Sequence, residues 1–67
     1  MATYEGVGAT LDEAISKAHD KIPIREGRDF VVSRVTGWGM QTGGFIFERK
    51  YYAQLEEDPT APFRTDK

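Results

Sequence analysis

The amino-acid sequence predicts an α+β fold, in which a three-stranded antiparallel sheet of order β-α-β-β packs on one amphipathic helix. A capping motif, Thr10 followed by Glu13, opens a stripe of apolar residues at helical spacing. Segments rich in β-branched and aromatic residues lie on both sides of this stripe, and glycines separate the last two of them as in a hairpin. These observations predict a single domain over residues 1–57.

The first two predicted elements are a short strand and the helix. Residues 2–7 alternate in part and are closed by glycines, which is typical of a strand. The helix is expected to begin after Thr10, because its hydroxyl accepts from the third helical amide while Glu13 bonds back to the cap. Pro23 is expected to end it. The spacing of three and four predicts one buried stripe, namely Leu11, Ala14, Ile15, Ala18 and Ile22.

The remaining elements form a predicted hairpin. Residues 30–36 have the composition of a strand, residues 37–44 contain four glycines and predict a turn region, and residues 45–55 predict a long strand. Alternation places one set of residues on the same side of this last strand: Phe45, Phe47, Arg49, Tyr51, Ala53 and Leu55. One helix covers only one face of such a sheet, so the other face needs a second cover.

The size of the chain predicts self-association. A 67-residue chain buries only about 60% of the surface that its unfolded form exposes, and without cysteine it has neither disulfides nor a cysteine-based zinc site. We therefore expect a homo-oligomer in which a neighbouring subunit covers the open face. Residues 58–67 are acidic and contain proline, which predicts an extended or disordered tail unless Phe63 docks on a neighbour.

The charge pattern argues against nucleic-acid and membrane partners. The net charge is −2, whereas proteins that neutralise phosphates usually carry an excess of basic residues. No apolar run approaches the roughly 20 residues of a membrane span, and we expect a cytoplasmic protein. Residues 30–55 nevertheless carry three basic residues and one acidic residue, so any anion site is expected in this middle part.

Few residues offer catalytic or metal-binding chemistry, so we expect a protein that is not an enzyme. His19 is the only histidine and lies at the edge of the apolar stripe, where a half-buried packing role is more frequent than a catalytic one. The acidic run at residues 56–58 predicts a solvated chain end rather than a carboxylate-only metal site. The glycines of residues 6–8 lack the third glycine of the dinucleotide fingerprint, and Asp12 and Glu13 would repel a phosphate there.

Trp38 is the strongest candidate for a binding residue. It is the only tryptophan and lies between two glycines. A large ring in such a place either anchors an interface or stacks on a flat ligand, and interface anchoring is the more frequent role. Hydrogen-bond donors on the same hairpin are suited to orient a polar aromatic or anionic ligand: Arg34, Arg49, Tyr51 and Tyr52.

Two segments and the order of elements together point to a known family. Residues 8–15, GATLDEAI, form the capped segment after the first strand, and residues 53–57, AQLEE, close the last strand. With the β-α-β-β order and the chain length, they resemble the dodecins, small flavin-storing proteins, over roughly residues 3–57. The resemblance implies a long antiparallel hairpin wrapped around one helix and assembly into a hollow dodecamer.

The resemblance also implies a flavin site. In dodecins a tryptophan near the start of the second strand stacks on the isoalloxazine ring, and a glutamine on the third strand hydrogen-bonds it. The corresponding positions here fall near Asp29 or Phe30 and near Ile46, so neither family residue is present. We expect Phe30 to stack in place of the tryptophan, and Gln41 or Gln54 to bond the ring.

Two hypotheses follow from the sequence. The leading one is a non-enzymatic, dodecin-like homo-oligomer that binds or stores FMN, riboflavin or another flat small molecule between its subunits. Its expected ligand-binding residues are Trp38, Phe30, Arg34, Gln41, Arg49 and Tyr51. The alternative is an assembly or protein-interaction module without a ligand, in which Trp38 and the side of Phe45, Phe47 and Tyr51 form the contact.

Overall fold

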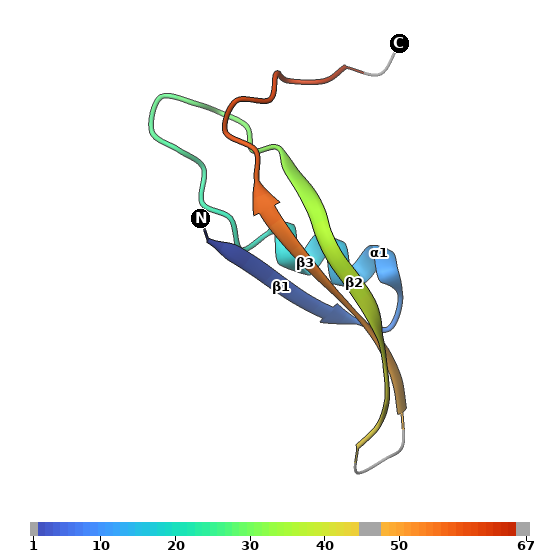
Figure 1. The fold of residues 1–67 in the computed structure, drawn as a ribbon. Coiled ribbons are helices and arrows are strands. Elements are labelled where there is room, and N and C mark those ends of the chain that lie inside the picture. Colours follow the sequence, from blue (N-terminus) through green and yellow to red (C-terminus); the bar gives the residue numbers. More distant parts are fainter. Residues whose placement is uncertain (1, 45–47, 66–67) are drawn as a thin grey trace.

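The computed structural model describes residues 2–44 and 48–65 and contains four elements in the order β-α-β-β. Strand β1 spans Thr3–Gly8, helix α1 spans Leu11–His19, strand β2 spans Ser33–Gly43 and strand β3 spans Glu48–Glu57 (Figure 1). β3 lies in the centre of one three-stranded sheet, and β1 and β2 pair with it antiparallel on either side. The predicted α+β fold is therefore confirmed.

A capping box fixes the start of α1, as the sequence predicts. Thr10 has an extended backbone, with φ −131°, and its hydroxyl accepts from the Glu13 amide at 3.1 Å. The Glu13 carboxylate in turn accepts from the Ala9 amide at 3.0 Å. The Thr10 bond satisfies an amide that the helix itself leaves without a partner, and the Glu13 bond closes on the residue before the cap rather than on the predicted cap amide.

The end of α1 differs from the prediction. The helix ends at His19 rather than at Ile22, because the amides of Lys21 and Ile22 donate to carbonyl oxygens three residues back and close the chain in a turn. Ile22 is still only 6% exposed, so the predicted apolar stripe continues past the helix. Within residues 2–44 and 48–65, no helix has the length and apolar character that crossing a membrane requires.

The capping box makes stability depend on pH in the acid range. The bond from the Ala9 amide, together with the Lys17 ammonium 3.5 Å away, lowers the pKa of Glu13 below its ordinary value of 4.5. A group with a lowered folded-state pKa stabilises the fold above its ordinary pKa, and this contribution is lost as pH falls through the lowered value. Urea unfolding of Glu13→Gln between about pH 6 and pH 3 is therefore expected to show a shallower acid loss than the parent.

The matched control removes a charge from the same helical turn. Asp12→Asn leaves the bond between Glu13 and Ala9 intact, so its acid profile is expected to stay closer to that of the parent protein. Equal acid slopes for Glu13→Gln and the parent would contradict the role given to the Glu13 carboxylate.

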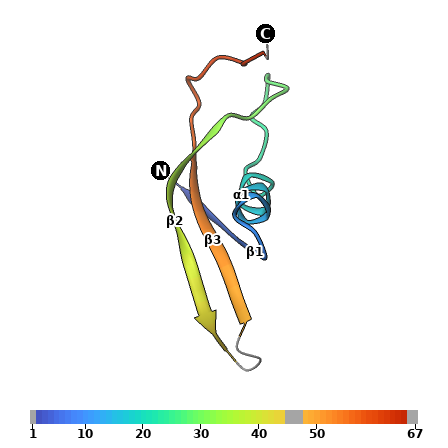
Figure 2. The same ribbon diagram turned by 90° about the vertical axis from the view of Figure 1, so that its right-hand side faces the viewer.

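The core lies between α1 and the β1 and β3 strands (Figure 2). It is small and rich in alanine: Ala14, Ala18, Ala53 and Leu55 are almost fully buried. Small residues let the helix approach the sheet closely, and Gly6 of β1 is the extreme case. A Cβ at Gly6 would lie 2.5 Å from the Ala18 nitrogen and closer still to the Ala14 carbonyl oxygen, so only glycine fits there.

The second strand differs most from the prediction. β2 starts at Ser33, three residues after the predicted start, and continues through Gly37, Trp38 and Gly39, which the sequence had assigned to a turn. In the strand, Gly37 and Gly39 lie next to side chains of β3. A Cβ at Gly39 would meet the Tyr52 hydroxyl at 2.6 Å, and one at Gly37 would meet the Gln54 side-chain oxygen at 3.0 Å.

The turn between β2 and β3 lies later in the chain than predicted. Gly43 and Gly44, the last two glycines of the predicted turn region, have φ of 129° and 93°, which other residues rarely adopt. The predicted strand start at residues 45–47 lies outside the described residues. From Glu48 on, β3 follows the predicted alternation, with Ala53 and Leu55 buried and Tyr51 partly buried against the helix.

The segment after β3 is held by the connector between α1 and β2. Residues 58–65 contain neither helix nor strand, but Ala61 is only 6% exposed. The Arg28 guanidinium donates to the carbonyl oxygens of Pro59 and Ala61. Phe63 packs on Phe30 of the same chain, with ring centres 5.3 Å apart.

Candidate functional site

Helix α1 lies on one face of the sheet but leaves β2, an outer strand, uncovered on that face. α1 packs against β1 and β3, and a hydrogen bond of 2.6 Å between His19 Nδ1 and Ser33 Oγ joins it to the start of β2. Beyond that point three apolar side chains of β2 lie on the helix side and are exposed by 43 to 61%: Val35, Trp38 and Met40. We call these three residues the β2 shelf.

A β-bulge sets the composition of the β2 shelf. The register with β3 shifts between Val35 and Gly37, so that Val35 lies opposite Leu55 and Trp38 lies opposite Ala53. Since residues directly opposite each other in an antiparallel pair share a face, both side chains lie on the side of the buried core. Without the bulge, residues three apart would lie on opposite faces.

Two side chains of β3 lie beside the β2 shelf. Tyr51 is opposite Met40 and Arg49 is opposite Thr42, on the same face as Trp38. Tyr51 is partly buried, and Arg49 is exposed. This face therefore combines an indole, a thioether, a phenol and a guanidinium on two adjacent strands, which are groups that can stack on and hydrogen-bond a flat ligand.

None of the other three predicted ligand residues lies on this face. Trp38, Arg49 and Tyr51 are together, but Arg34 and Gln41 lie on the opposite face of the sheet, opposite Glu56 and Lys50. Arg34 forms an ion pair with Glu56 at 3.7 Å. The sequence-based grouping of Arg34 with Trp38 depended on their place in the same hairpin, and the bulge puts the two residues on opposite faces.

Phe30 lies apart from both groups, in the connector before β2. One of its faces is covered by the Arg28 guanidinium, whose carbon lies 4.2 Å from the ring centre, and Phe63 contacts it edge to face at an interplanar angle of 71°. In the single chain this ring is therefore already packed on two sides. The stacking role that the resemblance implied for Phe30 would require Phe63 or Arg28 to move.

A cavity of about 340 Å³ lies beside Phe30, between the end of α1 and the connector. Its polar groups are His19, Asp20 and Asp29, and its apolar lining includes Ile22 and Ile24. His19 is half-buried and bonded to Ser33, as expected for a packing histidine. Within the described residues, no group of three or more His, Asp and Glu side chains is placed to hold a metal ion.

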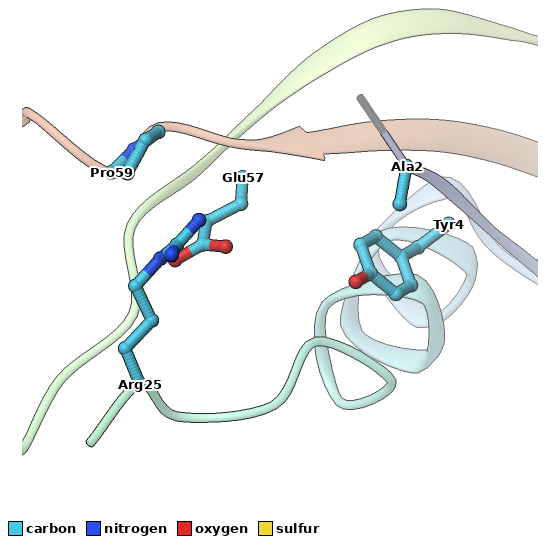
Figure 3. A pocket seen from close by; sticks show the side chains of 5 residues that line it. All are labelled: Ala2, Tyr4, Arg25, Glu57 and Pro59. Carbon is cyan, nitrogen blue, oxygen red and sulfur yellow. The ribbon is translucent and has the colours of Figure 1, made fainter.

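A second cavity of about 210 Å³ was not predicted from the sequence (Figure 3). It is lined by Ala2, Tyr4, Arg25, Glu57 and Pro59, and the Tyr4 hydroxyl points across it toward an ion pair between Arg25 and Glu57 of 2.8 Å. The bond to Glu57 raises the pKa of Arg25. Tyr4 and Arg25 lie in separate segments of the sequence, so no local pattern brings them together.

Met40 and Val35 are the shelf residues that the sequence analysis missed. The alternation of Trp38 and Met40 was the available signal, but it was obscured because the segment was assigned to a turn. No family model, no curated protein and no solved structure matches this chain. The assignment of a function therefore depends on the geometry of the site.

Proposed function

We propose that this chain is a non-enzymatic subunit of a small homo-oligomer, similar to the dodecins, that holds a flat aromatic molecule on the β2 shelf. Flavin, as FMN or riboflavin, is the first candidate. The observation that carries the proposal is Trp38, an indole 61% exposed on a regular strand, with no helix above it. Aromatic side chains of this size stabilise folds and complexes mainly when they are covered.

The groups around Trp38 suit both the isoalloxazine ring and the phosphate of FMN. The indole and the Met40 thioether offer an apolar surface for the isoalloxazine ring, and Tyr51, opposite Met40, supplies a hydroxyl for its polar edge. Arg49 supplies a positive charge two residues from Tyr51, which suits the phosphate of FMN. Riboflavin lacks that phosphate and is expected to bind more weakly.

A single subunit does not enclose such a ligand. Trp38 lines neither of the two cavities described above, and the β2 shelf is open to solvent. Small-molecule sites usually bury most of the ligand surface. The proposal therefore places the ligand between subunits, with a second copy of the chain completing the site.

The decisive experiment is a titration of the protein with FMN and with riboflavin, read by tryptophan fluorescence. Trp38 is the only tryptophan, so all tryptophan quenching is read from this one indole. We expect quenching at micromolar flavin, and about a tenfold loss of FMN affinity in Arg49→Gln, which corresponds to about 1.4 kcal/mol. Riboflavin affinity is expected to change little in the same variant.

The matched control is Arg34→Gln, which removes the same charge from the opposite face of the sheet. Its FMN affinity is expected to stay within about twofold of the parent, since exposed surface changes usually have small effects. Absence of quenching at micromolar flavin, with the oligomer intact, would contradict the ligand part of the proposal.

The alternative is an assembly or protein-interaction module without a ligand. The observation that favours it is the apolar character of the β2 shelf, since Val35, Trp38 and Met40 carry no charged group. In that case the exposed side chains form only a subunit contact. Phe45 and Phe47, which the sequence analysis assigned to the same contact, lie outside the described residues.

A further inference from the structure

The two edges of the sheet differ in how they are protected against pairing with another strand. Edge strands present unpaired amides and carbonyls, and proteins usually block them by short length, charges or lysine side chains. β1 has six residues, carries Glu5, and has the Glu5 carbonyl oxygen occupied by the Lys21 ammonium at 2.6 Å. The β1 edge is therefore short and partly closed.

The β2 edge lacks these protections along its regular part. β2 spans 11 residues and has one sheet neighbour, β3. From Gly37 to Gly43 its register with β3 is regular, and the segment GWGMQTG contains neither a charged residue nor a proline. The bulge, which also discourages edge pairing, lies before this stretch.

We propose that residues 37–43 of β2 pair antiparallel with the same residues of a second copy, so that two sheets become one sheet of six strands. The proposal rests on the homo-oligomer of the proposed function and names its contact. A two-fold axis requires this antiparallel arrangement, because each residue must meet its partner reciprocally. Seven residues form about six to eight inter-strand hydrogen bonds, within the roughly 10 ± 5 of a typical interface.

This pairing would complete the ligand site. A two-fold axis perpendicular to the sheet keeps both helices on the same side and brings the two β2 shelves next to each other. Trp38 and Met40 of both copies then form one apolar floor, and the two α1 helices form its walls. The shelf, which is open in one subunit, thus becomes a groove that needs the second copy.

Spin labels test the pairing directly, because the chain has no cysteine and accepts single labels at chosen positions. Four exposed positions on β2 are suitable: Arg34→Cys, Thr36→Cys, Gln41→Cys and Thr42→Cys. In an antiparallel pair the distance between equal residues grows by about 7 Å for each residue away from the axis. We expect the shortest distances at residues 41 and 42, and longer ones at 36 and 34.

The control label is Glu5→Cys on β1, the far edge of the sheet. In a six-stranded sheet its two copies are separated by five strand spacings, about 24 Å or more. Light scattering on each labelled protein gives its mass. An oligomer in which residues 41 and 42 are not the closest positions would overturn the pairing and leave the proposed oligomer standing, whereas a monomer would overturn both.

Discussion

Gly6→Ala is expected to abolish most of the stability of the fold. The added Cβ would lie 2.5 Å from the Ala18 nitrogen and closer still to the Ala14 oxygen, and both are backbone atoms of α1. Backbone cannot rotate away as a side chain does, so the helix must lift from the sheet and loosen the alanine-rich core. Overpacking costs about 1–3 kcal/mol or more, while a core of this size supplies only about 3–5 kcal/mol.

Urea unfolding followed by circular dichroism measures this effect, and Gly37→Ala is the matched control. At Gly37 the nearest atom is the end of the Gln54 side chain, at 3.0 Å, which can move. We expect the control to change stability by less than about 1 kcal/mol. Similar unfolding midpoints for the two variants would contradict the close approach of α1 to β1.

Leu55→Ala is expected to have the second large effect. Leu55 is 1% exposed and is the largest fully buried side chain of the described residues. Truncating a buried leucine costs about 2–5 kcal/mol, because the apolar transfer energy is lost and a cavity remains. In a domain of this size we expect a largely unfolded protein at room temperature, with loss of the cooperative urea transition.

Val7→Ala is the control for Leu55→Ala. Val7 lies on the other face of the sheet, opposite Tyr52, and is 44% exposed. Its truncation is expected to cost less than about 1 kcal/mol. A cooperative transition in Leu55→Ala at the midpoint of the parent would show that the core lies elsewhere.

The helix could be predicted from the sequence because its signals are local. Thr10 and Glu13 are three residues apart, and each side chain accepts a hydrogen bond from a backbone amide near the start of the helix. This pairing of residue types can therefore be recognised in the sequence itself. The apolar stripe has the spacing of a single helix face. The early end at His19 could not be predicted in the same way. The amides of Lys21 and Ile22 form a turn with the last helical carbonyl oxygens, so the helix ends before the chain reaches Pro23.

The extent of β2 could not be predicted from its own residues, because the side chains next to its glycines belong to another strand. Gly37 and Gly39 have the usual signature of a turn, yet here they make room for Gln54 and Tyr52 of β3. The β2 segment alone does not determine the cross-strand register that brings these residues together. A glycine next to a side chain of a neighbouring strand and a glycine in a turn look the same in sequence.

For the same reason, only part of the candidate site could be predicted. Trp38 stands out in the sequence as a single tryptophan between glycines, and Arg49 and Tyr51 as hydrogen-bond donors on the same hairpin. Arg34 was grouped with Trp38, but the bulge between Val35 and Gly37 places them on opposite faces. The bulge leaves no clear mark in the sequence, so the β2 shelf required the structure.

The mass of the purified protein is the most direct test of whether this chain works as a homo-oligomer. Size-exclusion chromatography with light scattering, at about 10–100 μM protein, should give a multiple of the chain mass of 7.6 kDa. We expect at least a dimer, with no significant population of single chains. A single species of 7.6 kDa over this range would contradict it.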